Sequence, residues 1–221
     1  MFIGHFGVGF AGKTIDKQPS LGTMFLAAQF LDILWPVFLL LGIEKVKIIP
    51  DGSAFENLNF TYYPFSHSFL GALVWSLLFG LVYYAFKKNI SGSVLLGSLV
   101  FSHWILDLFT HVPDLPLTPW SNIKLGLGLW NVPVATIVIE SMIYFGGAYL
   151  YLKFRKDENK KGLIGSISLM ILLFIIYIAS TFGSAPPSVD AIGFAGLGLW
   201  VFVAWAYWID RKPKTSSKSG T

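Results

Sequence analysis

Long apolar runs, each about as long as a bilayer is thick, dominate the chain. A transmembrane helix needs about 20 mainly apolar residues. Windows of that length recur along the sequence, and short segments rich in charge, proline or glycine separate them. We therefore predict an all-α polytopic transmembrane helical bundle with six spans. The predicted spans are 21–43, 67–86, 91–111, 127–152, 163–182 and 189–209.

The residues before Lys13 are also apolar, but they are too few to cross a bilayer and lack the basic start of a signal peptide. We expect a short, half-inserted N-terminal helix that stays attached. Counting back from Lys13 at about 1.5 Å per residue puts His5 about 12 Å into the membrane. Asp32, His103 and Glu140 fall near the middle of their predicted spans. Four ionisable side chains therefore share one mid-membrane layer.

The composition supports a membrane protein. Hydrophobic residues make up 54% of the chain and charged residues 13%, against about 25% charged residues in soluble domains. The absence of cysteine excludes disulfides, thiolate metal sites and cysteine nucleophiles, which leaves histidine and carboxylate as the strong metal ligands. The net charge of +4 lies in short loops between spans, so we expect no nucleic-acid partner.

The basic residues are distributed very unequally between the two sides of the predicted bundle. When the spans alternate across the bilayer, thirteen lysines and arginines fall on one side, and only Lys45, Lys47 and Lys124 fall on the other. By the positive-inside rule, we predict a prokaryotic inner-membrane protein with both termini in the cytoplasm. We expect one integral membrane domain, 1–209, with a metal-site half, 1–152, and scaffold helices, 163–209. The remainder, 210–221, is predicted to be a disordered cytoplasmic tail.

The densest group of ionisable residues lies in the third predicted span. His103, Asp107 and His111 recur every four residues, which at about 100° per residue keeps them on one helix face. An ionisable group in hydrocarbon costs several kcal/mol unless it is paired, hydrated or bound. Imidazole and carboxylate are ligands of zinc-like ions. The spacing therefore indicates either a metal site or a proton site.

Several of these features have a structural alternative. Asp32 precedes Pro36 by four residues, so its carboxylate could instead make a hydrogen bond at a proline kink. The glycines at 7, 9, 12, 126 and 128 form weak phosphate-loop patterns, and close helix packing is the more common reason for such glycines. The last two predicted spans carry no interior acid or histidine, so we expect them to serve as scaffold or as a homo-oligomer face.

Together, these motifs resemble a known family. The set formed by His5, Asp32, Ser66-His67-Ser68 and the helix from His103 to His111 is similar to the YdjM-like inner-membrane proteins labelled metal-dependent hydrolases. That group is distantly similar to zinc-dependent phospholipase C and P1-type nucleases. The resemblance covers residues 1 to about 152. One departure is Tyr62-Tyr63-Pro64-Phe65, where the group often has His-Arg-Gly-x.

The resemblance implies a site and a chemistry. It implies one or two zinc or other divalent ions held by His5, Asp32, His67, His103 and Asp107. It also implies hydrolysis of a phosphoester in a lipid or lipid-linked substrate that enters from the outer side. Acid-base work then falls to Glu140 or Asp114, with His111 as a ligand or a neighbour of the ligands. Near the outer mouth, Trp120, Lys124 and Asn131 are candidates to contact a polar head group.

Two functions from other classes use the same residues. A cation or proton transporter or channel could pass ions along the intramembrane acids and histidines without breaking a bond. Such a protein would be expected to show an inverted repeat with polar residues in both halves, and this chain shows neither. A structural membrane protein could use a metal only to hold helices together.

Overall fold

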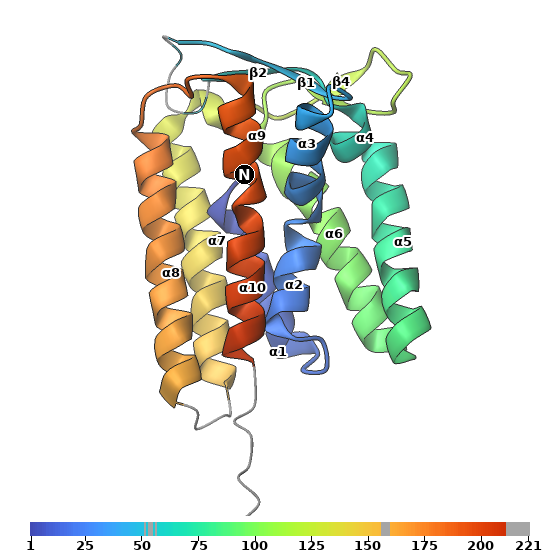
Figure 1. The fold of residues 1–221 in the computed structure, drawn as a ribbon, viewed down its shortest axis with the longest axis vertical. Helices are drawn as coiled ribbons and strands as arrows, with labels where there is room; N and C mark the ends of the chain where they lie inside the picture. Colours follow the sequence, from blue (N-terminus) through green and yellow to red (C-terminus); the bar gives the residue numbers. More distant parts are fainter. Residues whose placement is uncertain (51, 53–54, 56, 156–159, 211–221) are drawn as a thin grey trace, which may run out of the picture.

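The computed structural model describes residues 1–50, 52, 55, 57–155 and 160–210. It confirms the predicted helical membrane bundle (Figure 1). The helices are α1 (Ile3–Ile15), α2 (Leu21–Ala28), α3 (Phe30–Leu40), α4 (Pro64–His67), α5 (Phe69–Lys87), α6 (Ile90–Thr110), α7 (Pro133–Phe154), α8 (Lys160–Thr181), α9 (Val189–Leu197) and α10 (Leu199–Ile209). The 3-10 helix Leu129–Asn131 precedes α7. Residues 211–221 of the predicted tail lie outside the described residues.

Five segments of the described chain are long and apolar enough to cross a membrane: α5, α6, α7, α8 and the α9–α10 pair. The predicted first span, 21–43, differs from a simple helix because α2 and α3 meet at 57°. If this bent pair counts as one span, the total is six, as predicted. The break lies at Gln29, seven residues before Pro36, which lies inside α3. The fourth span also begins later than predicted, at Pro133.

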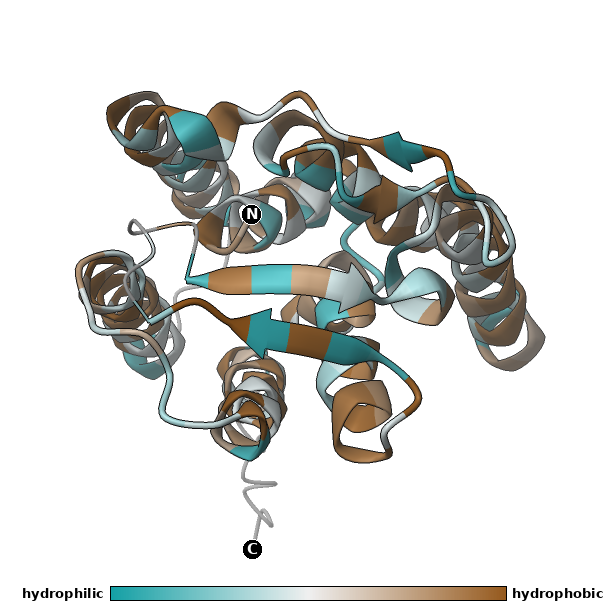
Figure 2. Ribbon diagram, turned by 90° about the horizontal axis from the view of Figure 1, so that it is seen from above, coloured by the Kyte–Doolittle hydropathy of each residue, from teal (hydrophilic) through white to brown (hydrophobic). Residues whose placement is uncertain are grey.

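Two small antiparallel sheets, which the apolar pattern does not predict, lie at one end of the bundle (Figure 1). Strand β1 (Lys45–Ile48) pairs with β2 (Leu58–Tyr62), and β3 (Leu115–Pro116) pairs with β4 (Lys124–Leu125). Seen from above, the β1–β2 hairpin lies across the helix ends (Figure 2). Val46 packs there with Leu39 and Ile192. The hairpin therefore covers the end of α3 and the start of α9.

Helix α1 lies in the interior of the bundle and packs tightly against α7. A Cβ on Gly147 would lie 1.9 Å from the carbonyl oxygen of Gly7, and a Cβ on Gly7 would lie 2.6 Å from the carbonyl oxygen of Ile143. Around this contact, Phe6, Phe10, Phe25 and Tyr144 form part of the main core. The glycines of α1 are therefore packing residues, as the sequence favours.

Gly126 and Gly128 have a different role from the helix packing expected of them. They lie outside the helices, in a loop, with φ angles of +155° and +73°. Only glycine adopts such angles readily. At Gly126 a Cβ would also meet the carbonyl oxygen of Val112. These two glycines therefore shape the connection between α6 and α7.

The α5–α6 connection, the end of α7, the start of α8 and the end of α10 lie at the end of the bundle opposite the sheets (Figure 1). Lys87 and Lys153 belong to that end, whereas Lys45 and Lys124 lie on the strands. Among the described residues, the two groups of basic residues that the sequence analysis distinguishes therefore lie at opposite ends of the molecule. Met1 is buried, with 7% of its surface exposed. The side of the membrane at which each terminus lies stays a prediction.

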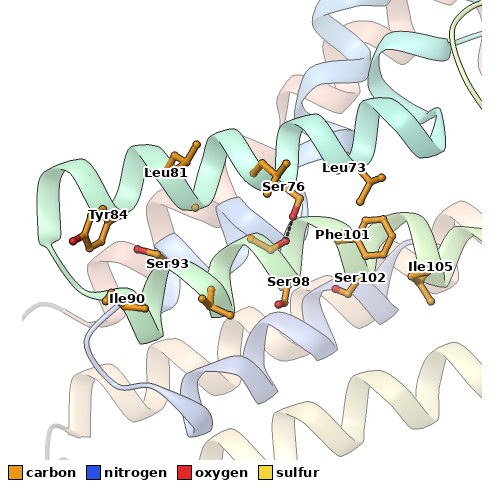
Figure 3. Close-up of a pocket in the computed structure, with 14 residues that line it drawn as sticks. Leu73, Ser76, Leu81, Tyr84, Ile90, Ser93, Ser98, Phe101, Ser102 and Ile105 are labelled. Atoms are coloured by element: carbon orange, nitrogen blue, oxygen red, sulfur yellow. Dashed lines mark hydrogen bonds between the residues drawn. The ribbon is translucent and has the colours of Figure 1, made fainter.

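The outer helix faces carry many exposed apolar side chains, including Leu81 on α5, Ile164 on α8 and Val201 on α10. Helices α5 and α6 also enclose an apolar groove of about 660 Å³ (Figure 3). Small residues such as Ser76 and Gly97 line it, and the Ser76 hydroxyl donates to the Gly97 carbonyl oxygen. None of the predicted ligands lines this groove. The candidate site lies elsewhere, among α1, α3, α4 and α6.

Candidate metal centre

Five of the predicted site residues meet inside the bundle although they come from four separate helices. They are His5 on α1, Asp32 on α3, His67 on α4, and His103 and Asp107 on α6. They form two overlapping groups, His5–His103–Asp107 and Asp32–His67–His103. Within each group, one ligand atom per residue lies within 4.8 Å of the others. The structure thus brings together the ligand set that the family resemblance implies.

The two carboxylates lie between the imidazole rings. His103 Nε2 is 3.2 Å from Asp107 Oδ2 and 3.6 Å from Asp32 Oδ1. His67 Nε2 is 3.4 Å from Asp32 Oδ1 and 3.8 Å from Asp107 Oδ2. His5 Nε2 is 3.1 Å from Asp107 Oδ1, and its ring stacks on His103 with centroids 3.6 Å apart. Three imidazoles and two carboxylates therefore converge on one point.

The helix break at Gln29 orients the His103 ring. Ala28 is the last residue of α2, so its carbonyl is one of the end carbonyls that the helix itself leaves unused. His103 Nδ1 lies 2.8 Å from that oxygen. A carbonyl oxygen can only accept, so Nδ1 must carry a proton. In the neutral ring, Nε2 is then the unprotonated nitrogen that faces Asp107 and Asp32.

The two carboxylates at His103 Nε2 favour a positive charge at this point of the cluster. His103 Nε2 is fully buried and has no hydrogen-bond partner among the described residues. A nitrogen lone pair facing two carboxylate oxygens in a buried site is unfavourable unless a cation lies between them or the ring takes up a second proton. Imidazole and carboxylate are the usual ligands of zinc and related divalent ions. The residues present therefore fit a divalent metal.

One side of the cluster is open. The Asp32 side chain is 26% exposed, whereas the side chains of the other four residues are at most 5% exposed. Asp32 Oδ1 also points toward His67 and His103, so this carboxylate does not serve the proline kink considered as its alternative role. Asp32 is therefore the member of the cluster nearest to the surface.

The first residues of the chain lie against the cluster. The Met1 amino group is 2.7 Å from Asp107 Oδ1. The backbone N–H of Phe2 donates to Glu140 Oε2 at 2.8 Å, and Gln29 Nε2 donates to the Phe2 carbonyl oxygen at 3.4 Å. The N–H groups at a helix start have no partner within the helix. Glu140 on α7 therefore holds the start of α1, and with it His5.

His111 does not join His103 and Asp107 on one helix face, contrary to the spacing argument. Helix α6 ends at Thr110, and His111 has extended backbone angles two residues before Pro113. A residue so close to proline is a common helix end. The His111 ring leaves the cluster, and its Nδ1 lies 2.9 Å from Asp114 Oδ1. His111 and Asp114 therefore form a separate pair.

This second pair is connected to the cluster through Tyr63. The Tyr63 hydroxyl donates to Asp114 Oδ1 at 2.7 Å, and its ring centroid is 5.4 Å from that of His67. Burial and the Asp114 carboxylate raise the pKa of Tyr63 well above its ordinary value, so the phenol stays a donor. Tyr63 belongs to the segment that departs from the family pattern. The residue that hydrogen-bonds Asp114 is therefore one at which this chain differs from the family pattern.

The three residues predicted to contact a polar head group, Trp120, Lys124 and Asn131, have different surroundings. Lys124 Nζ lies 5.7 Å from the centroid of the Tyr63 ring, which places its charge beside the second pair. The Trp120 side chain is 84% exposed, and the Asn131 side chain approaches Gly128 in the loop before α7. Of these three residues, Lys124 is the one that lies against Tyr63, next to the site.

Glu44 is the residue that the sequence analysis misses. It lies between α3 and β1, is 1% exposed, and accepts hydrogen bonds from the backbone of Phe65 and Ser66. Burial raises the pKa of its carboxyl, and these donors oppose that shift. No motif marks it, because its partners lie about twenty residues away in the sequence. Only a buried acid beside α4 draws attention to it.

Comparison with known proteins gives one result. A family model described as "YdjM inner membrane protein" matches residues 7–183. The match includes Asp32, His67, His103 and Asp107, and it begins two residues after His5. No significant match is found among curated proteins or among solved structures. Because the match covers most of the chain, the protein belongs to the YdjM inner membrane protein family.

Proposed function

We propose that this protein is a membrane-embedded, metal-dependent hydrolase whose metal is held by His5, Asp32, His67, His103 and Asp107. One observation supports this most strongly: two carboxylates converge on His103 Nε2, which has no hydrogen-bond partner in the described part of the chain. Zinc is the proposed ion, with one or two per chain. A bound divalent ion would lower the pKa of a water molecule and stabilise charge on a phosphoryl oxygen.

The chain's own residues would divide the remaining work. His111 and Asp114 are the proposed acid-base pair, because the carboxylate fixes the imidazole through Nδ1 and leaves Nε2 for proton transfer. Glu140 is a weaker candidate for this role, because its carboxylate is engaged by the backbone of Phe2. Lys124, beside Tyr63, would attract an anionic group. These positions favour a phosphoester in a lipid or lipid-linked substrate.

Access is proposed from the end of the bundle that carries the strands, which the basic asymmetry predicts to face outward. A cysteine at Ser121 should react with a membrane-impermeant reagent from outside intact cells, and a cysteine at Lys88 should not. Labelling of the Lys88 position from outside would reverse the proposed direction of access. The proposed setting is a prokaryotic inner membrane.

Metal analysis of the purified protein tests the centre. We expect a stoichiometric divalent ion in the wild type, and His103→Ala should lose it together with thermal stability, because metal binding and folding are coupled. His111→Ala is the matched control, since it removes an imidazole outside the cluster and should keep the ion. Equal metal content in the wild type and His103→Ala would disprove the assignment of α6 as the ligand helix.

Hydrolysis of lipid phosphoesters tests the reaction. We expect cleavage by the wild type, and a loss of about 10²-fold to 10⁴-fold in His111→Ala with the metal retained, which is the usual effect of removing an acid-base group. Ion flux through vesicles containing the wild type, with no cleavage across the panel, would support the transporter instead. Bound metal without flux or cleavage would support the structural role.

A further inference from the structure

A chain of three polar side chains, Glu44, Ser66 and His67, runs from the α3–β1 connection to the candidate metal centre. Glu44 Oε2 is 2.6 Å from Ser66 Oγ, and Ser66 Oγ is 2.7 Å from His67 Nδ1. All three residues are at most 4% exposed. Bulk water therefore does not compete for these contacts.

The direction of each hydrogen bond follows from the donors and acceptors. Glu44 Oε1 accepts from the backbone N–H groups of Phe65 and Ser66, both at 2.8 Å. With Ser66 Oγ on the other oxygen, three donors surround one carboxylate, which is the environment of the ionised, acceptor-only form. The single hydroxyl proton of Ser66 is then donated to Glu44. Ser66 Oγ is left as an acceptor toward His67.

The orientation of the Ser66 hydroxyl determines which nitrogen of His67 carries the proton. If Ser66 Oγ accepts, His67 Nδ1 must donate, and the neutral ring carries its proton there. His67 Nε2 is then unprotonated where it faces Asp32 Oδ1 at 3.4 Å and Asp107 Oδ2 at 3.8 Å. The opposite tautomer would turn the Ser66 hydroxyl proton toward His67. It would leave a serine lone pair 2.6 Å from Glu44 Oε2.

We propose that Glu44, acting through Ser66, is a positioning residue that holds His67 as the Nδ1–H tautomer and directs its Nε2 lone pair toward Asp32 and Asp107. His103 is fixed in the same sense by the Ala28 carbonyl oxygen. Two different hydrogen-bond arrangements thus leave Nε2 of His67 and Nε2 of His103 free to bind the same cation. The consequence for metal affinity rests on the proposed function, whereas the tautomer of His67 does not.

Glu44→Gln tests the direction of the relay, because the amide keeps the size of the carboxylate and adds a donor. Its oxygen can accept from the Phe65 and Ser66 backbone, which turns the NH₂ group toward Ser66 Oγ. Ser66 must then accept from Gln and donate to His67 Nδ1. We expect the His67 proton to move to Nε2. Ser66→Ala removes the relay without reversing it.

Nitrogen-15 NMR of histidine-labelled, metal-free protein in lipid reads the tautomer directly, with the His67 signals assigned by their loss in His67→Asn. We expect the Nδ1–H form in the wild type and the Nε2–H form in Glu44→Gln. An Nε2–H tautomer in the wild type, or the same tautomer in both proteins, would overturn the proposal. The tautomer can be measured even if the wild type binds no metal. Absence of metal binding would contradict the proposed function but not the proposed tautomer.

Zinc affinity, measured by competition with a chromophoric chelator, is the second readout. Loss of a hydrogen-bond partner behind a metal ligand usually lowers affinity about 10-fold to 100-fold, and we expect a loss of that size in Glu44→Gln. Thr61→Val is the matched control, because Thr61 Oγ1 donates to the Lys45 carbonyl oxygen within the same hairpin and does not contact His67. Unchanged affinity in Glu44→Gln, or an equal loss in Thr61→Val, would contradict the positioning role.

Discussion

The segment from α1 to α7 and the segment from α8 to α10 are both built from apolar helices, yet among the described residues only the first buries acids and histidines. Among the described residues, those buried in the first segment are His5, Glu44, His67, His103, Asp107, His111 and Glu140. In the second segment, the buried side chains that carry a hydroxyl include Ser166, Tyr177 and Thr181. The Ser166 hydroxyl donates to the Gly162 carbonyl oxygen in the same helix.

This difference shows how a membrane bundle tolerates polar groups. In the α8–α10 segment, the Ser166 hydroxyl donates to the backbone of its own helix and accepts from Arg155, so replacing Ser166 removes no charge. In the metal-site cluster of the first segment, each ionisable group contacts a group from another helix. Asp107 on α6, for example, contacts both His5 on α1 and His67 on α4. Losing one member there leaves the others buried without a partner.

Asp107→Asn should give the largest effect. It removes the negative charge beside three imidazoles and the Met1 amine, and breaking a buried charge pair typically costs about 3–5 kcal/mol. We expect loss of the metal and a clear fall in melting temperature. Elemental analysis and thermal unfolding measure the two effects. A melting temperature within error of the wild type would show that Asp107 is not the centre of the network.

Gly147→Ala should give the next largest effect, by separating α1 from α7. The new Cβ would lie 1.9 Å from the Gly7 carbonyl oxygen, which α1 can avoid only by moving. Overpacking of this kind costs about 1–3 kcal/mol, and it should weaken metal binding because His5 moves with α1. Gly146→Ala is the matched control, since nothing lies within 4 Å of its added Cβ. Similar unfolding of both variants would contradict the close approach.

Glu140 should give an intermediate effect that depends on the substitution. Glu140→Gln keeps an oxygen to accept from the Phe2 N–H, so we expect the metal to stay and activity to remain within a few-fold of the wild type. Glu140→Ala leaves that donor unpaired and should lower stability by about 0.5–2 kcal/mol, as for a lost helix cap. A fall of about 10²-fold or more in the rate of Glu140→Gln would instead make Glu140 the acid-base residue.

Ser166→Ala should give the smallest effect and tests the other side of the comparison. It removes a buried hydroxyl whose partners are the Gly162 carbonyl oxygen and the Arg155 guanidinium. A typical hydrogen bond contributes about 0.5–1.5 kcal/mol, and no ligand lies on α8. We expect metal content and hydrolysis to match the wild type. Loss of metal in this variant would mean that the α8–α10 segment is not merely scaffold.

The sequence alone was enough to place most of the spans and to predict one mid-membrane layer for His5, Asp32, His103 and Glu140. Span length follows from bilayer thickness, and the high cost of an ionisable group in hydrocarbon makes each such residue conspicuous in an apolar run. Asp32, His103 and Asp107 could therefore be selected by position and spacing. His5 was selected by its predicted depth, His67 was added by the family pattern, and the structure places all five together.

Only the tertiary structure decided which atoms face one another. The break at Gln29 frees the Ala28 carbonyl oxygen for His103, 75 residues away. The end of α6 turns His111 toward Asp114, and Glu44 reaches Ser66 across 22 residues. Phe2 and Glu140 are 138 residues apart. Hydropathy and helical spacing are local properties of the chain, whereas these contacts depend on how separate helices pack, and that packing determines which nitrogen of each imidazole is available to a metal.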